Sequence, residues 1–256
     1  MGLTAEHKMM VAGHRGESYH YYENTMEAFV AAIDAGADMI ETDVRITKDG
    51  ALVLIHDETV DRTTDGTGYV KEKSFEEMRK LNACGKDNFR QIPTLEELLV
   101  LLKERNILLN LELKEYYSEE NAERCHQCID ECVKIIEKYQ FADKMVFNSF
   151  DAHVLEYIAD KDHGKYLLHG FYPYSIMKNV KRNPDEYLYC ACIWGPGGYR
   201  NPAYYEYLKE KGIEAWIGAS VTREGDLKES FELGASLITT NSPKDCVDKL
   251  KKIGAR

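Results

Sequence analysis

Short apolar runs alternate with amphipathic stretches along almost the whole chain. An uninterrupted apolar run is typical of a parallel strand buried on both faces, and an apolar period near 3.6 residues is typical of a helix that covers a sheet. The apolar runs predict strands at residues 9–13, 38–44, 107–114, 144–150, 165–170, 187–194, 213–220 and 236–241. The stretches that follow predict helices at 24–36, 94–105, 119–140, 151–161, 174–182, 201–212, 224–233 and 243–252.

These eight strand–helix units predict an α/β fold, the closed (β/α)₈ TIM barrel. The alternative for such a pattern is an open, doubly wound sheet. The glycine-rich dinucleotide-binding motif of that fold is absent after the first strand, which argues against it. The 256 residues match the usual length of one barrel, so we expect residues 1–256 to form a single domain.

One interval breaks the alternation. About fifty residues, 45 to 93, separate the second strand from its helix, and a structureless loop of that length is uncommon in a compact domain. The Asp49-Gly50 pair predicts a hairpin turn that leads into a short apolar strand, and "SFEEMRKL" predicts a short helix. We therefore expect a small insertion at about 45–93, on the face where the strands end, rather than a second domain.

Composition narrows the range of partners. The formal net charge of −11 argues against nucleic acid or an anionic membrane as the main partner, because neither would find a basic surface to dock on. No window approaches the ~20 apolar residues of a membrane-spanning helix. The N-terminus lacks the basic region and long apolar core of a signal peptide. We expect a cytoplasmic protein without stable membrane insertion, unless an export signal has been removed.

The seven cysteines, an odd number, fit a reducing compartment. Cys125, Cys128 and Cys132 share one face of a predicted helix, which raises the question of a metal site. No second cysteine pair completes such a site, so we expect these residues in the core. We expect the same of Cys190 and Cys192 on a predicted strand.

Polar residues gather at the ends of the first three predicted barrel strands. In a (β/α)₈ barrel these ends open on the face that carries the chemistry. The residues are His14 and Arg15, Glu41 and Asp43, and Glu112 and Lys114, and His56 returns from the insertion. Residues at i and i+2 of a strand point to the same side, so each of the last two pairs shares one face.

Three carboxylates on neighbouring strands repel one another unless a cation or a proton offsets their charge. Hard oxygen ligands suit a divalent metal, Mg²⁺ or Ca²⁺, and the residue types alone do not choose between these ions. Arg15 and Lys114 can neutralise a phosphodiester beside the metal. His14 and His56 can divide general base and general acid work. The joint pattern favours a metal-dependent phosphodiesterase.

The same residues lie in a series of motifs: "HRG" (14–16), "ENTMEAF" (23–29), "GADMIETDVRITKDGALVLIHD" (36–57), "DRTTDGTG" (61–68), "IPTLEE" (92–97) and "LNLELK" (109–114). In order and spacing this series resembles the glycerophosphodiester phosphodiesterases, members of the PLC-like phosphodiesterase superfamily. The second half is similar only in shorter segments, "NSF" (148–150) and "GASLITTNSP" (234–243).

The resemblance implies a TIM barrel with a small insertion after strand 2, and hydrolysis of glycerophosphodiesters to sn-glycerol 3-phosphate and an alcohol. It implies that the metal ligands are Glu41, Asp43 and Glu112, that the catalytic residues are His14 and His56, and that Arg15 and Lys114 contact the phosphate. Trp216 becomes a candidate substrate-facing aromatic. Two positions depart from the family: Tyr22 stands where proline is usual, and Ala219 stands where asparagine is usual near Trp216.

Two other functions remain open at this stage. A lysophospholipase D acting on acylated substrates would need an apolar groove. A non-catalytic binder of glycerophosphodiesters would be expected to lack at least one of the histidines or acids, yet all are present. Tyrosines after several predicted strands are either a surface rim or an aromatic wall for the leaving group. The head group, the choice of metal and the oligomeric state stay undetermined.

Overall fold

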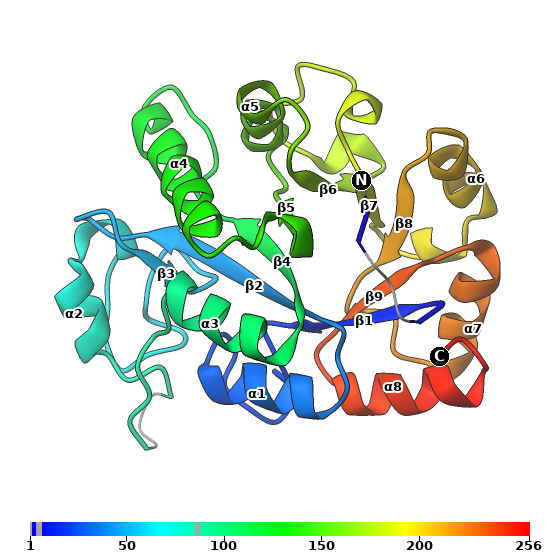
Figure 1. Cartoon of the computed structure of the whole chain (residues 1–256), viewed down its shortest axis with the longest axis horizontal. Coiled ribbons are helices and arrows are strands. Elements are labelled where there is room, and N and C mark those ends of the chain that lie inside the picture. The colour runs from blue at the N-terminus through cyan, green and yellow to red at the C-terminus, as the bar shows by residue number, and fades with distance from the viewer. Residues whose placement is uncertain (1, 4–6, 85–87) are drawn as a thin grey trace.

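Eight parallel strands form the centre of the computed structural model, which describes residues 2–3, 7–84 and 88–256 (Figure 1). They are β1 (Met10–His14), β2 (Met39–Ile46), β4 (Leu108–Leu113), β5 (Met145–Asn148), β6 (Leu167–Tyr172), β7 (Cys190–Ile193), β8 (Glu214–Ile217) and β9 (Leu237–Thr240). β1 pairs in parallel with both β2 and β9, which closes the sheet. The predicted TIM barrel is confirmed.

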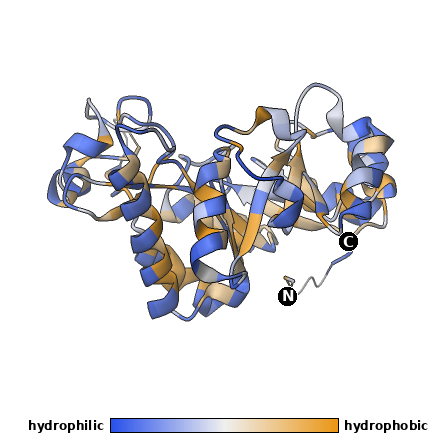
Figure 2. Cartoon of the chain, turned by 90° about the horizontal axis from the view of Figure 1, so that it is seen from above, coloured by the Kyte–Doolittle hydropathy of each residue, from blue (hydrophilic) through white to orange (hydrophobic). Residues whose placement is uncertain are grey.

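Helices cover the outside of this ring of strands (Figure 1). They are α1 (Met26–Asp34), α3 (Leu95–Arg105), α4 (Ala122–Lys138), α5 (Ala152–Asp162), α6 (Pro202–Glu210), α7 (Glu224–Leu233) and α8 (Pro243–Lys252). Local sequence fixes several starts: Thr94 and Glu97 form a capping box on α3, and Pro243 takes the first position of α8. Hydrophobic residues concentrate on the strands, while the outer surfaces of the helices are more hydrophilic (Figure 2).

The helix predicted at 174–182 is wrong. The segment after β6 forms only two short 3₁₀ turns, Tyr174–Ile176 and Pro184–Glu186. Between them Lys178 is extended: its N–H donates to the carbonyl of Phe150, and its own carbonyl accepts from Ala152 N–H. These backbone bonds to the loop after β5 replace the hydrogen bonds that a helix would have made.

The insertion after β2 contains the predicted hairpin and short helix. β3 (Leu52–Leu54) pairs antiparallel with the end of β2 beyond a turn in which Gly50 has a φ of 91°. α2 (Phe75–Lys80) begins with a capping box from Ser74. The insertion has its own small core, made of Val53, Ile55, Val60, Val70, Met78, Ala83 and Ile92. Residues 85–87 of the predicted insertion lie outside the described residues.

The cysteines behave as predicted from their spacing. Cys125, Cys128 and Cys132 are fully or almost fully buried on the inner face of α4, and Cys190 and Cys192 are buried on β7. None is placed in a potential metal cluster within the described part of the chain. None of the described helices is long and apolar enough to cross a membrane.

Candidate active site

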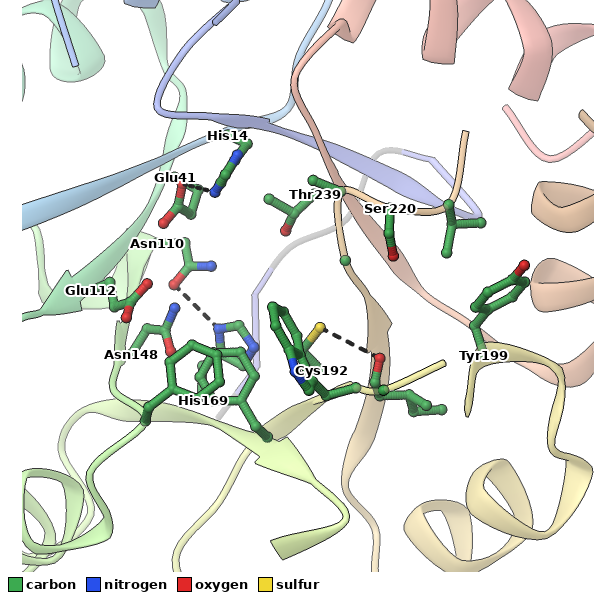
Figure 3. A pocket seen from close by; sticks show the side chains of 18 of the residues that line it. His14, Glu41, Asn110, Glu112, Asn148, His169, Cys192, Tyr199, Ser220 and Thr239 are labelled. Carbon is green, nitrogen blue, oxygen red and sulfur yellow. Dashed lines mark hydrogen bonds and ion pairs between the residues drawn. The ribbon is translucent and has the colours of Figure 1, made fainter. Parts of the chain in front are cut away.

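A cavity of about 590 Å³ opens at the carboxyl ends of the barrel strands. One side, here called the charged wall, consists of His14, Arg15, Glu41, His56, Glu112 and Lys114. The other side, here called the aromatic wall, consists of Phe150, Phe171, Trp194 and Tyr199. Several of these side chains point into the common space in Figure 3. The structure therefore brings six of the eight predicted site residues to one cavity, and Asp43 lies directly beside them.

Two acids of the charged wall, Glu41 and Glu112, form a buried acid cluster with Asp43. Glu41 and Asp43 share one face of β2, and Glu112 lies opposite Asp43 on β4. One oxygen of each acid lies within 4.8 Å of one oxygen of each of the others. Burial and the neighbouring Asp43 raise the pKa of Glu41 to about 8. Burial raises the pKa of Glu112 to about 7 even though Lys114 opposes this. A hard divalent cation would relieve both effects, so the donor set fits such an ion.

Asp43 differs from the two glutamates because two fixed cations contact it. Burial opposes its ionisation, but Lys114 and Arg15 outweigh burial and lower the pKa of Asp43. Lys114 Nζ lies 3.2 Å from Asp43 Oδ1 and 2.5 Å from Glu112 Oε1. Arg15 Nε lies 3.3 Å from Asp43 Oδ2. Asp43 thus stays ionised in the protein without a bound metal.

His14 ends β1 and faces the acid cluster. Its Nδ1 lies 2.5 Å from Asn241 Oδ1, and its Nε2 lies 3.9 Å from Glu41 Oε2 (Figure 3). An amide oxygen only accepts, so Nδ1 carries the proton and Nε2 is free to take one. Burial and the nearby Arg15 lower the pKa of His14. The ring is therefore a neutral base near pH 7.

His56 reaches the same cavity from the insertion, just beyond β3. Its Nδ1 lies 2.7 Å from Asp57 Oδ1, which holds the proton on Nδ1 and turns Nε2 away from Asp57. Burial lowers the pKa of His56, while Asp43 opposes this. The two histidines thus share a pattern in which an oxygen holds Nδ1 as the protonated ring nitrogen, so that Nε2 can accept a proton.

A hydrogen-bonded bridge centred on Arg62 links the surroundings of His56 to those of Arg15. Its guanidinium donates to both carboxylate oxygens of Asp57 and to both of Glu23, over distances of 2.6 to 3.0 Å. Glu23 in turn accepts a 2.9 Å bond from Arg15. The bridge therefore joins the partner of His56 to the partner of Arg15. Sequence reasoning assigned no role to Glu23, Asp57 or Arg62, although all three lie in or next to the motifs that carried the resemblance.

The turn after β1 has backbone features that only some residues tolerate. Arg15 has a φ of 56°, and its N–H donates to both the carbonyl and the carboxylate of Glu41. Gly16 has a φ of 86°, and a Cβ there would lie 2.5 Å from the carbonyl carbon of Ala28. Glycine is needed at this position because the backbone of α1 passes so close.

Asn24 is a further residue that sequence reasoning missed. Its Nδ2 donates to Asp43 Oδ2 over 2.9 Å, and its Oδ1 accepts from Thr42. These contacts fix the orientation of the Asp43 carboxylate. The side chain is buried, and it lies in the "ENT" motif that the sequence offered as a signal.

Trp216 does not lie where it was expected. It is fully buried inside the barrel, in a cluster with Met10, Met39 and other apolar residues, and it is not part of the cavity lining. The side chain of a β8 residue at this position points into the barrel below the cavity, where Trp216 packs on His169 with ring centroids 4.7 Å apart. Trp194, which is 47% exposed at the mouth, is the tryptophan of the cavity.

Of the two interpretations of the tyrosines, a surface rim or an aromatic wall, the structure favours the rim for most of them. Tyr199 is the tyrosine found in the cavity lining among the described residues, and Tyr19, Tyr21 and Tyr22 are exposed outside it. Phe150 and Phe171 stack with centroids 3.5 Å apart, and Trp194 meets both rings edge-on. The aromatic wall therefore consists mainly of phenylalanine and tryptophan, which the sequence analysis did not consider for this role.

Comparisons with known proteins agree with this geometry. Residues 14–206 match the model of the "Glycerophosphoryl diester phosphodiesterase family". The chain is 32% identical over 259 residues to a glycerophosphodiester phosphodiesterase of Caldanaerobacter subterraneus subsp. tengcongensis, covering 96% of this chain and 100% of that protein.

Solved structures show the same fold. The crystal structure of a glycerophosphodiester phosphodiesterase from Agrobacterium tumefaciens matches with a TM-score of 0.76 and 24% identity, covering 93% of this chain and 98% of that one. A phosphodiesterase from Oleispira antarctica, solved in complex with the product sn-glycerol-3-phosphate, matches with a TM-score of 0.78 and 20% identity, over 94% of this chain and 96% of that one.

Proposed function

The chain belongs to the glycerophosphoryl diester phosphodiesterase family, and from that premise we propose that it hydrolyses glycerophosphodiesters to sn-glycerol 3-phosphate and an alcohol. It is thus a phosphoric diester hydrolase. The observation that carries the proposal is the charged wall together with Asp43, which brings three acids, two histidines and two fixed cations together at one cavity.

Glu41, Asp43 and Glu112 would hold the divalent metal, Mg²⁺ or Ca²⁺. When bound, such an ion supplies positive charge that polarises a phosphoryl oxygen. The raised pKa values of Glu41 and Glu112 support this role, because burial and the neighbouring acids disfavour their ionised forms and a bound cation would favour them. Arg15 and Lys114 add positive charge for the phosphate in an otherwise acidic protein.

His14 and His56 would share the proton transfers. One histidine takes a proton from the nucleophile, which is water or the neighbouring glycerol hydroxyl acting through a cyclic phosphate. The other, in its doubly protonated form, gives the proton on Nε2 to the leaving alcohol. Their lowered pKa values support base work by either ring near pH 7, and Asp57 and Asn241 each hold one nitrogen so that the other faces the substrate.

The aromatic wall supports a second candidate, hydrolysis of acylated glycerophosphodiesters as by a lysophospholipase D. Phe150, Phe171 and Trp194 offer apolar surface across the cavity from the acids. The same surface suits a quaternary ammonium through cation–π contact. Glycerophosphocholine, glycerophosphoglycerol and lysophosphatidylcholine, assayed side by side, rank these possibilities, and equal efficiency on the first two removes the cation–π contribution.

Release of sn-glycerol 3-phosphate from glycerophosphoethanolamine tests the proposal. The assay is run with Mg²⁺, with Ca²⁺ and with a chelator. We expect release that depends on the metal, with the more effective ion identifying the site's preference. A folded protein that releases no product with either ion would contradict the hydrolase assignment for this substrate class.

A further inference from the structure

Two histidines on neighbouring helices meet on the outside of the barrel. His126 lies in the second turn of α4, His153 is the second residue of α5, and the two helices pack side by side (Figure 1). Nε2 of one ring lies 3.0 Å from Nε2 of the other. Both residues are partly exposed, and neither belongs to the lining of the catalytic cavity. The structure thus places two imidazole nitrogens together at a site that the proposed reaction does not use.

Two tyrosines hold the planes of these rings. His126 stacks on Tyr157 with ring centroids 4.2 Å apart and an angle of 7° between the planes. His153 stacks on Tyr117 with centroids 3.7 Å apart and an angle of 27°. Each imidazole keeps its stack when it turns within its own plane and loses the stack when it swings out of that plane. The stacks therefore keep the two nitrogens close together before any ligand arrives.

In the protein alone, a single proton lies between the two nitrogens. A neutral imidazole donates from one nitrogen and accepts at the other, so one Nε2 carries the proton and the facing Nε2 accepts it. The ring centroids are 5.3 Å apart, which shows that the rings meet end to end. Burial and the neighbouring His126 lower the pKa of His153. This ring is therefore neutral near pH 7, the form in which imidazole binds metals.

The charges around the pair favour a cation over an anion. Asp151 and Glu156 lie close enough to His153 to raise its pKa, whereas Lys181 lies close enough to lower it. Two acids thus face one lysine at this ring. An anion would need both rings protonated, and two N–H groups that face each other over 3.0 Å would repel.

A transition-metal ion is the cation that suits two imidazoles. Zn²⁺, Ni²⁺ and Cu²⁺ bind imidazole nitrogen, whereas Mg²⁺ and Ca²⁺ prefer oxygen. Two nitrogens that share one such ion, each about 2.1 Å from it, lie about 3.0 to 3.4 Å apart. The 3.0 Å between the two Nε2 atoms falls at the short end of this range. A turn of each ring within its own plane points both lone pairs at an ion beside the line that joins them, and the tyrosine stacks permit that turn.

We propose that His126 and His153 form a site for a divalent transition-metal ion, separate from the acid cluster, with water in the remaining coordination positions. The ion is bound by both Nε2 atoms and replaces the proton between them. That proton passes through solvent to Nδ1 of its own ring, so both imidazoles stay neutral. The bound ion ties α4 to α5. This inference goes beyond the proposed function and does not depend on it, because neither histidine lines the cavity.

Calorimetric titration with Zn²⁺ in excess Mg²⁺ tests the site. Wild type is compared with His126→Phe and His153→Phe, which keep a ring against each tyrosine and remove its nitrogens. Any zinc taken up by the acid cluster is common to all three proteins, so the difference between them belongs to the histidine pair. His20→Ala is the matched control, because His20 is an exposed histidine beside Glu17 on another part of the surface.

We expect wild type to have a zinc site that each phenylalanine variant weakens by at least about tenfold, because one of its two protein ligands is lost. His20→Ala should bind zinc as wild type does. Substoichiometric Cu²⁺ gives a second signal, since imidazole binds it well. Its electron paramagnetic resonance spectrum should show coupling to two nitrogens in wild type and to fewer in each phenylalanine variant.

Three results would overturn the inference. The first is equal zinc binding by wild type and a folded phenylalanine variant, with melting temperatures showing which variants are folded. The second is loss of the zinc site in His20→Ala, which would assign the ion to His20 and Glu17. The third is a wild-type Cu²⁺ spectrum with oxygen ligands alone, a measurement that needs no variant to fold.

Discussion

At the scale of single residues, the three buried acids of the site differ in their pKa values. Asp43 contacts both Arg15 and Lys114 and has a lowered pKa, whereas Glu41 and Glu112 have raised pKa values. Similar carboxylates thus differ in charge because their neighbours differ. The strand positions of these acids were readable from the sequence, but the contacts that decide their charge come from other strands and loops.

His169 supplies a pH-dependent prediction at this scale. Burial lowers its pKa from 6.5 to about 3. Between these values the unfolded chain binds a proton that the folded protein does not, so the free energy of unfolding falls as the pH falls below 6.5. Replacing His169 by phenylalanine removes this loss. We compare the free energy of unfolding of His169→Phe with that of wild type at each pH. The variant minus wild-type value should be about 2 kcal/mol higher at pH 5 than at pH 8.

Urea unfolding of both proteins at pH 8 and pH 5 measures this gain. A His169→Phe difference that is the same at both pH values would show that the ring is not kept neutral by burial. Asn148→Leu, which removes a neighbouring polar atom without a titrating group, is the control and should show no pH-dependent difference.

At the scale of elements, the insertion contributes to the site as well as to the surface. It supplies His56, and its Arg62 bridge ties the turn after β3 to the turn after β1. Two of these contacts join residues 39 positions apart. Pattern and periodicity report neighbours on the same helix or strand, so a bridge between two loops leaves no such trace in the sequence.

Arg62 is expected to position His56 and Arg15 rather than to touch substrate. Arg62→Ala removes the cation that Asp57 and Glu23 share. His56 and Arg15, which these two acids hold, should then be less well placed, and kcat should fall by about 10- to 100-fold. Arg62→Lys should recover only part of this, because lysine cannot make the paired bonds of a guanidinium. Arg79→Ala is the control, since Arg79 also lies in the insertion but pairs with Glu97 on α3.

Steady-state kinetics and the pH profile of kcat check this role. A positioning role predicts that the limb of the profile that depends on His56 shifts in Arg62→Ala, because Asp57 loses its cation. An Arg62→Ala enzyme with unchanged kcat and an unchanged profile would show that the bridge serves stability alone.

At the scale of the whole molecule, the fold was predictable because its signal is repeated. All eight strands were found from runs of apolar residues that the barrel buries on both faces. The helix at 174–182 was not formed because Lys178 bonds instead to the loop after β5, a contact made only in the folded chain. The burial of Trp216 likewise depends on how the strands meet inside the barrel.

The site differs in charge from the rest of the molecule. The chain has a net charge of −11, so positive charge for a phosphate must be supplied locally. In the proposed function Arg15 and Lys114, which both contact Asp43, supply it. The charged wall thus places two fixed cations in an acidic protein, and the sequence predicted its members because all except His56 lie at the ends of three consecutive barrel strands.

The most direct test of the central claim is the turnover of glycerophosphoethanolamine by His14→Ala and His56→Ala, each compared with His20→Ala. His20 is an exposed histidine that pairs with Glu17 and lies outside the cavity lining. If the two cavity histidines transfer the protons, each of their variants should lose about 100-fold or more in kcat while keeping its melting temperature, and His20→Ala should remain active. A folded His14→Ala or His56→Ala protein with nearly full turnover would contradict the account.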